Sequence, residues 1–70
     1  MEEKLKSQSI RRLDIKDNVL EILEYNNIQN LGKLCGKSKS DLKKLDLTPN
    51  QINNIEVEMQ LLGLNLKNSL

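Results

Sequence analysis

The apolar residues of this chain recur at helical spacing, most clearly near the C-terminus. There, four aliphatic side chains stand three or four residues apart: Ile52, Ile55, Met59 and Leu62. This spacing predicts a helix over residues 49–62 that buries one face. Thr48 and Gln51 form a capping-box pattern around Pro49, which is a favourable first helical residue. Gly63 is the residue type that most often ends such a helix.

Similar signals predict three shorter helices, over residues 17–26, 30–35 and 39–45. Asp17 is expected to cap the first of them, and the Asn-Asn pair at 26–27 to end it, because asparagine readily adopts the left-handed conformation. Gly36 ends the second helix, and a serine-aspartate pattern at Ser38 or Ser40 begins the third. No strand pattern accompanies these signals. The chain is therefore expected to be all-α, with four to five helices.

The two ends of the chain are expected to lie outside this helical domain. Residues 1–12 are rich in charge and carry few aliphatic side chains, so they are expected to form a flexible tail or the end of a linker. Residues 67–70 are expected to form a C-terminal tail. Leu13 and Ile15 alternate with charged residues, which is typical of a short extended segment. The domain is thus expected to span residues 13–66.

The composition excludes several classes of protein. With one cysteine, Cys35, and no histidine, the sequence offers no disulfide, no usual zinc-binding set and no Cys-His nucleophile. We therefore expect no metal, no cofactor, no small-molecule substrate and no catalysis, with Cys35 a small buried hydrophobe rather than a reactive thiol. Tyr25 is the only aromatic residue, so a stacking platform for single-stranded nucleic acid is missing. No apolar run reaches the length of a membrane span, so we expect a soluble, cytoplasmic chain.

The net charge of +1 hides an uneven distribution of charged residues. Residues 17–30 carry three carboxylates and no base, whereas residues 31–47 carry five lysines against two aspartates. A basic stretch is typical of a surface that binds acidic partners, but scattered lysines also form an ordinary solvated face. Charge alone does not separate these two interpretations.

The order of these elements carries a resemblance to a known family. The features concerned are a Leu-Asp-Ile start at 13–15, the segment Ile28-x-x-Leu31-Gly32-x-Leu34, a capped Ser-x-x-Asp-Leu helix, and a Leu-Gly-Leu-x-Leu ending at 62–66. Together they resemble the C-terminal domain of the bacterial RNA polymerase alpha subunit, over residues 13–66 and with a one-residue deletion near Leu45. The resemblance implies a compact domain related to paired helix-hairpin-helix units. It also implies a non-catalytic, nucleoid-associated part of the polymerase, linked to the core enzyme, that docks promoter DNA and transcription factors.

The same resemblance assigns DNA-facing positions. Asn18 stands where the family usually has an arginine that enters the minor groove, and Glu21 stands where it has an asparagine. The family's Gly-Lys-Lys-Ser signature aligns with residues 48–51, here Thr-Pro-Asn-Gln. The full set of DNA-facing candidates is Asn18, Glu21, Lys43, Lys44, Thr48, Asn50, Gln51 and Asn54. Because the arginine that enters the minor groove in the family is replaced here by a neutral amide, binding to A·T-rich promoter DNA is expected to be weak or altered. The alternative is that these amides are ordinary helix caps and surface residues.

The resemblance also places protein contacts on the chain. Asp14 matches an acidic residue that faces sigma, and the candidates for an activator surface are Lys37, Lys39 and Ser40. Asp14 is also explained as a plain solvent-facing residue. The alternative function is a helical protein-protein interaction domain without DNA binding, which pairs with a partner or with a second copy. In that interpretation Ile22 belongs to an exposed apolar patch, unless it only enlarges the core.

Overall fold

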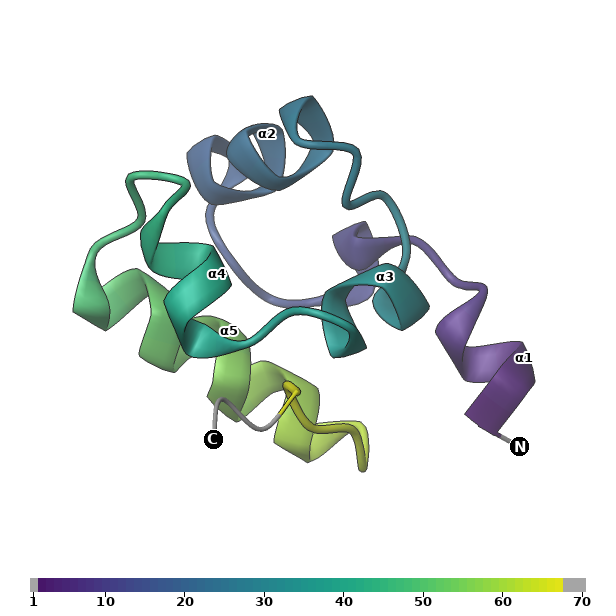
Figure 1. Cartoon of the computed structure of the whole chain (residues 1–70). Coiled ribbons are helices and arrows are strands. Elements are labelled where there is room, and N and C mark those ends of the chain that lie inside the picture. Colours follow the sequence, from purple (N-terminus) through teal and green to yellow (C-terminus); the bar gives the residue numbers. More distant parts are fainter. Residues whose placement is uncertain (1, 68–70) are drawn as a thin grey trace.

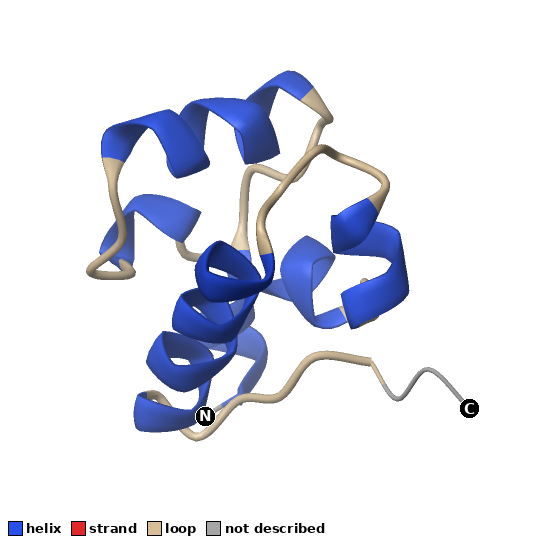
Figure 2. Ribbon diagram, turned by 90° about the vertical axis from the view of Figure 1, so that its left-hand side faces the viewer, coloured by secondary structure: helices blue, strands red, loops and turns tan. Residues whose placement is uncertain are grey.

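The computed structural model describes residues 2–67 and confirms the all-α prediction. Its elements in chain order are α1 (Glu2–Lys6), the 3-10 helix η1 (Ile10–Arg12), α2 (Asp17–Tyr25), α3 (Leu31–Cys35), α4 (Lys39–Lys43) and α5 (Pro49–Leu61) (Figure 1). Within residues 2–67 there is no strand, and the one extended pairing is an isolated bridge between Ser9 and Asn30. Short loops join the helices (Figure 2).

The longest helix, α5, begins as predicted. The Thr48 hydroxyl accepts a hydrogen bond from the Gln51 amide at 3.1 Å, and Gln51 Oε1 accepts one from the Thr48 amide at 2.9 Å. Pro49 follows as the first helical residue, where no amide hydrogen is needed. The capping box therefore fixes both the start of α5 and the position of the Gln51 side chain.

Gly63 and Gly36 end their helices with different backbone conformations. Gly63 has a φ of +79°, whereas Gly36 has a φ of −80° in the right-handed region. We expect Gly63→Ala to lower the free energy of unfolding by about 1 kcal/mol, because an L side chain is strained in the left-handed region. Gly36→Ala is the matched control, since its new Cβ would lie 3.4 Å from the Lys33 carbonyl oxygen, and it should be neutral or slightly stabilising. Urea denaturation measures both, and equal losses would contradict the expectation.

The first predicted helix is present as α2, and its end is confirmed. Asn27 adopts a φ of +64°, and Asn26 Nδ2 donates to the Ile22 carbonyl at 2.7 Å. The start is corrected. Lys16, not Asp17, is the N-cap and makes no side-chain capping hydrogen bond. Asp17 is instead the first helical residue, where a carboxylate favours the positive end of the helix dipole.

The two short helices α3 and α4 also begin at capping residues. The Asn30 side chain accepts the amide of Lys33 at 2.8 Å, and Ser38 forms the predicted capping box with Asp41. Hydrogen bonds from the Ser38 amide and hydroxyl lower the pKa of the Asp41 carboxyl. After α4, Asp46 takes a φ of +65° in the turn into α5.

A single apolar core joins the elements from η1 to the residues that follow α5. Its buried members are Ile10, Leu13, Val19, Leu20, Leu23, Ile28, Leu31, Leu34, Leu42, Leu47, Ile52, Ile55, Met59 and Leu64. Cys35, expected to be buried, is only partly buried against this core, and Ile22 is partly buried as well. The predicted buried stripe of α5 is confirmed at Ile52, Ile55 and Met59, whereas Leu62 is the C-cap of the helix and is only partly buried.

Residues 2–12 differ from the expected flexible tail. Ile10 is fully buried, at 0% exposure. Its amide donates to the Gln29 carbonyl at 3.3 Å, and the Leu31 amide donates to the Gln8 carbonyl at 2.9 Å. Helix α1 also lies against α3 (Figure 1). The expectation over residues 1–12 is therefore corrected for residues 2–12, because backbone pairing with the loop before α3 places this segment on the core.

Two ion pairs and one backbone hydrogen bond tie surface segments together. Arg11 donates to both carboxylate oxygens of Glu24, at 2.9 and 2.8 Å, and this lowers the pKa of Glu24. Lys39 pairs with Glu56 at 3.1 Å, which links α4 to α5. The Lys67 amide donates to the Lys37 carbonyl at 2.9 Å. The rest of the expected C-terminal tail, residues 68–70, lies outside the described residues.

Candidate functional site

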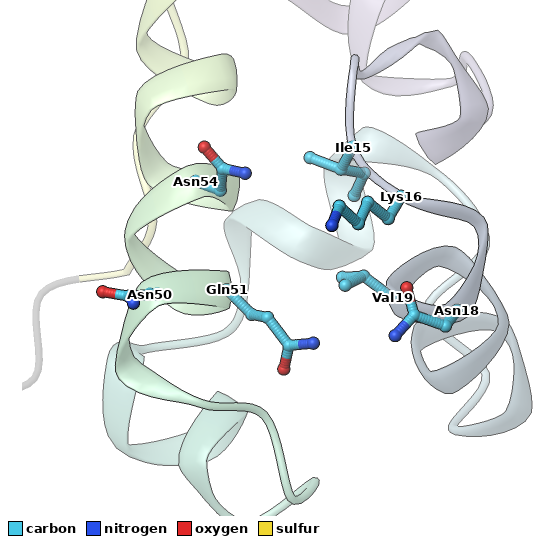
Figure 3. A pocket seen from close by; sticks show the side chains of 7 residues that line it. All are labelled: Ile15, Lys16, Asn18, Val19, Asn50, Gln51 and Asn54. Carbon is cyan, nitrogen blue, oxygen red and sulfur yellow. The ribbon is translucent and has the colours of Figure 1, made fainter.

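A cleft of about 230 Å³ lies where the first turn of α2 faces the first turns of α5 (Figure 3). We call it the amide cleft, and its lining residues are Ile15, Lys16, Asn18, Val19, Asn50, Gln51 and Asn54. Four of the predicted DNA-facing residues therefore share one cleft. They come from segments far apart in the sequence, which the fold brings together.

The apolar part of the amide cleft is formed by the segment that leads into α2. Val19 is buried, and Ile15 is partly buried against the core. Both side chains point towards the gap between α2 and α5 (Figure 3). They support the polar residues at the edges of the cleft, because the α2 backbone is held in place by the packing of Val19.

The polar part consists mainly of carboxamides. Gln51 and Asn18 extend towards one another from α5 and α2, whereas Asn50 points away from α2 (Figure 3). Gln51 Oε1 is occupied by the Thr48 amide, so its amino group remains as the donor towards the cleft. Asn18 and Asn54 are exposed and offer both a carbonyl acceptor and an amino donor.

Lys16 supplies the positive charge of the amide cleft. Its ammonium group points into the space between the two helices (Figure 3). Sequence reasoning missed this residue because Asp17 was taken as the helix cap. The sequence did offer a signal, because Lys16 directly precedes the predicted helix. A residue at that position lies next to the first helical turn, which carries Asn18.

A second cleft adjoins the amide cleft on the other side of Asn18. It has a volume of about 610 Å³, and we call it the tyrosine cleft; its lining residues are Asn18, Glu21, Ile22, Tyr25, Asn26, Lys44, Leu45 and Asp46. Glu21 and Lys44, both predicted to face DNA, lie here rather than in the amide cleft. Ile22, predicted to contact protein, lies here too. Tyr25 is 89% exposed, and sequence reasoning did not select it as a site residue.

The remaining predicted residues lie on other parts of the surface. Thr48 is exposed and caps α5, and Lys43 is exposed in the last turn of α4. The positions assigned to protein contacts are Asp14, Ser40 and Lys39, all exposed, and Lys37, which is partly buried. Of these, Lys39 is already engaged by Glu56, and the Lys37 carbonyl accepts the Lys67 amide.

Chemically, the amide cleft can donate and accept hydrogen bonds and offers one cation. Among residues 2–67, no group of three or more His, Cys, Asp or Glu side chains is arranged to hold a metal ion. In the same part of the chain, no helix has the length and apolar character that crossing a membrane requires. Comparison of the chain with protein-family models and with curated proteins gives no match, so the family resemblance remains a prediction from the sequence.

Proposed function

We propose that this chain is a non-catalytic docking domain of the transcription apparatus, similar to the C-terminal domain of the RNA polymerase alpha subunit. In this proposal it is linked to the polymerase core, contacts sigma or activators, and touches promoter DNA weakly through the amide cleft. One observation carries the proposal. Asn18 and the start of α5, which align with the family's DNA-reading positions, line the same cleft.

The chemistry of the amide cleft suits the edge of a DNA groove. Carboxamide amino groups donate to phosphate oxygens and to the purine and pyrimidine acceptors on the minor-groove floor. Lys16 adds one charge-assisted contact. The carboxylates of Asp17 and Glu21, which are exposed on α2, repel the phosphate groups of DNA. Binding should therefore be weak and only modestly dependent on salt, because few cations are available to release counterions from DNA.

The surface away from the clefts supports the protein-docking part of the proposal. Asp14 is exposed in the extended segment before α2, and Ser40 is exposed on α4. Lys39 is held by Glu56, so a partner at α4 would have to compete for this lysine. An acidic partner is thus expected to gain less from Lys39 than it would from a lysine without an ion-pair partner.

The test is a titration of the chain with an A·T-rich duplex at low and at moderate salt, followed by amide chemical shifts. Shifts should cluster at Lys16, Asn18 and residues 48–54, and should weaken as salt rises. Lys16→Gln should lower the affinity and reduce the salt slope by about 1, whereas Lys33→Gln, an exposed lysine on α3, is the matched control. Shifts spread over all the lysines, or none at all, would reject the proposed DNA contact.

A second candidate function, self-association, is favoured by the tyrosine cleft. Ile22, Leu45 and the exposed Tyr25 form its apolar part, and the two carboxylates of Glu21 and Asp46 outnumber the one ammonium group of Lys44. A second copy would supply the complementary lysines of residues 31–47. Sedimentation velocity should then show concentration-dependent association that Tyr25→Ser and added salt both weaken. A monomer at every concentration would reject this alternative.

A further inference from the structure

We infer that the amide cleft selects minor grooves that contain guanine over grooves built only from A·T pairs. The inference rests on the proposed DNA contact and names the kind of duplex that this contact favours. In the minor groove, A·T pairs present only acceptors, whereas a G·C pair adds the exocyclic amino group of guanine as a donor. A side chain that recognises guanine in the minor groove therefore needs a hydrogen-bond acceptor beside a hydrogen-bond donor.

The amide cleft contains such paired groups. A carboxamide places a carbonyl oxygen and an amino group side by side, so it matches the adjacent donor and ring-nitrogen acceptor on the minor-groove edge of guanine. Among the hydrogen bonds between described residues, none engages the side chains of Asn18 or Asn54. Their acceptors are available, in contrast to the carbonyl of Gln51, which the Thr48 amide occupies.

Asn18 is the residue best placed to read the base. It is exposed in the first turn of α2, it lies between the amide cleft and the tyrosine cleft, and it faces the amino group of Gln51 (Figure 3). A guanidinium at this position would offer donors only. The carboxamide of Asn18 can instead accept from guanine while Gln51 donates to a neighbouring acceptor.

The charges around the cleft act in the same direction. Narrow A·T-rich grooves are preferred by cations because their negative potential is enhanced. Here Lys16 is the cation at the cleft, and the carboxylates of Asp17 and Glu21 stand on the adjoining helix α2. The electrostatic gain from a narrow groove is therefore small, and hydrogen-bond matching decides between sequences.

The experiment compares three duplexes that differ only in their central pairs: guanine-cytosine, inosine-cytosine and A·T. Inosine lacks the exocyclic amino group but keeps the major-groove face of guanine. The full chain should bind the guanine duplex at least about fivefold more tightly than the inosine duplex, as expected for one matched pair of hydrogen bonds. Replacing adenine by diaminopurine in the A·T duplex, which adds the amino group, should restore tight binding.

Variants assign the effect to the cleft. Asn18→Ala should abolish the difference between guanine and inosine, and Asn53→Ala, an exposed asparagine of α5 outside the cleft lining, should leave it unchanged. Equal binding of the guanine and inosine duplexes, or tighter binding of inosine, would overturn this inference while the proposed DNA contact stands. Absence of binding to every duplex would overturn both.

Discussion

An Ile10→Ala substitution is expected to remove most of the stability of this domain. Ile10 is fully buried and is held by the hydrogen bond from its amide to the Gln29 carbonyl. Truncation of a buried isoleucine costs about 2–5 kcal/mol, because the apolar transfer energy is lost and a cavity remains. A core of this size typically supports only about 3–5 kcal/mol, so the variant should be largely unfolded. Urea denaturation followed by circular dichroism measures the change.

The control is Leu61→Ala, which removes an aliphatic side chain of similar size from α5. Leu61 is 73% exposed, so its truncation should change the free energy of unfolding by less than about 0.5 kcal/mol. If Ile10→Ala proved as mild as this control, the N-terminal segment would behave as the tail that its composition suggests, and its packing on α3 would be refuted.

The N-terminal segment marks a limit of what the sequence predicts. The helices after residue 16 carry local signals, such as the Thr48–Gln51 and Ser38–Asp41 capping boxes, and these act within one turn of chain. The packing of residues 2–12 instead depends on backbone pairing between Ser9 and Asn30, which lie far apart in the sequence. Side-chain periodicity does not record that pairing, so the low aliphatic content of the segment dominated the prediction.

The candidate site shows the same division between local and non-local information. Asn18 and Gln51 were selected by aligning single positions, and the fold places them on one cleft. Lys16 was missed because the start of α2 was assigned one residue too late. Glu21 and Lys44 were grouped with Asn18 from the sequence, and they share the tyrosine cleft with it but do not line the amide cleft. Asp46, which takes a left-handed conformation in the turn between α4 and α5, lines the same cleft.

Asn18→Arg is expected to add a second cation, beside Lys16, to the amide cleft. The added charge should raise the affinity for an A·T-rich duplex about tenfold at low salt, which corresponds to about 1.4 kcal/mol. One more cationic contact should also steepen the salt dependence, with a slope change of about 0.9. Because a guanidinium has no acceptor, the preference for guanine over inosine should disappear. Fluorescence anisotropy with the same duplexes at several salt concentrations measures all three effects.

The matched control is Asn53→Arg, which adds the same charge to an exposed position of α5 outside the cleft lining. It should leave the ratio of guanine to inosine affinities unchanged and should alter the salt slope less than Asn18→Arg. Identical gains from both variants would mean that only the net charge of the chain matters. In that case the proposed reading of bases by the amide cleft would be rejected. A gain confined to Asn18→Arg would instead tie groove recognition to the first turn of α2, where Lys16 already provides a cation.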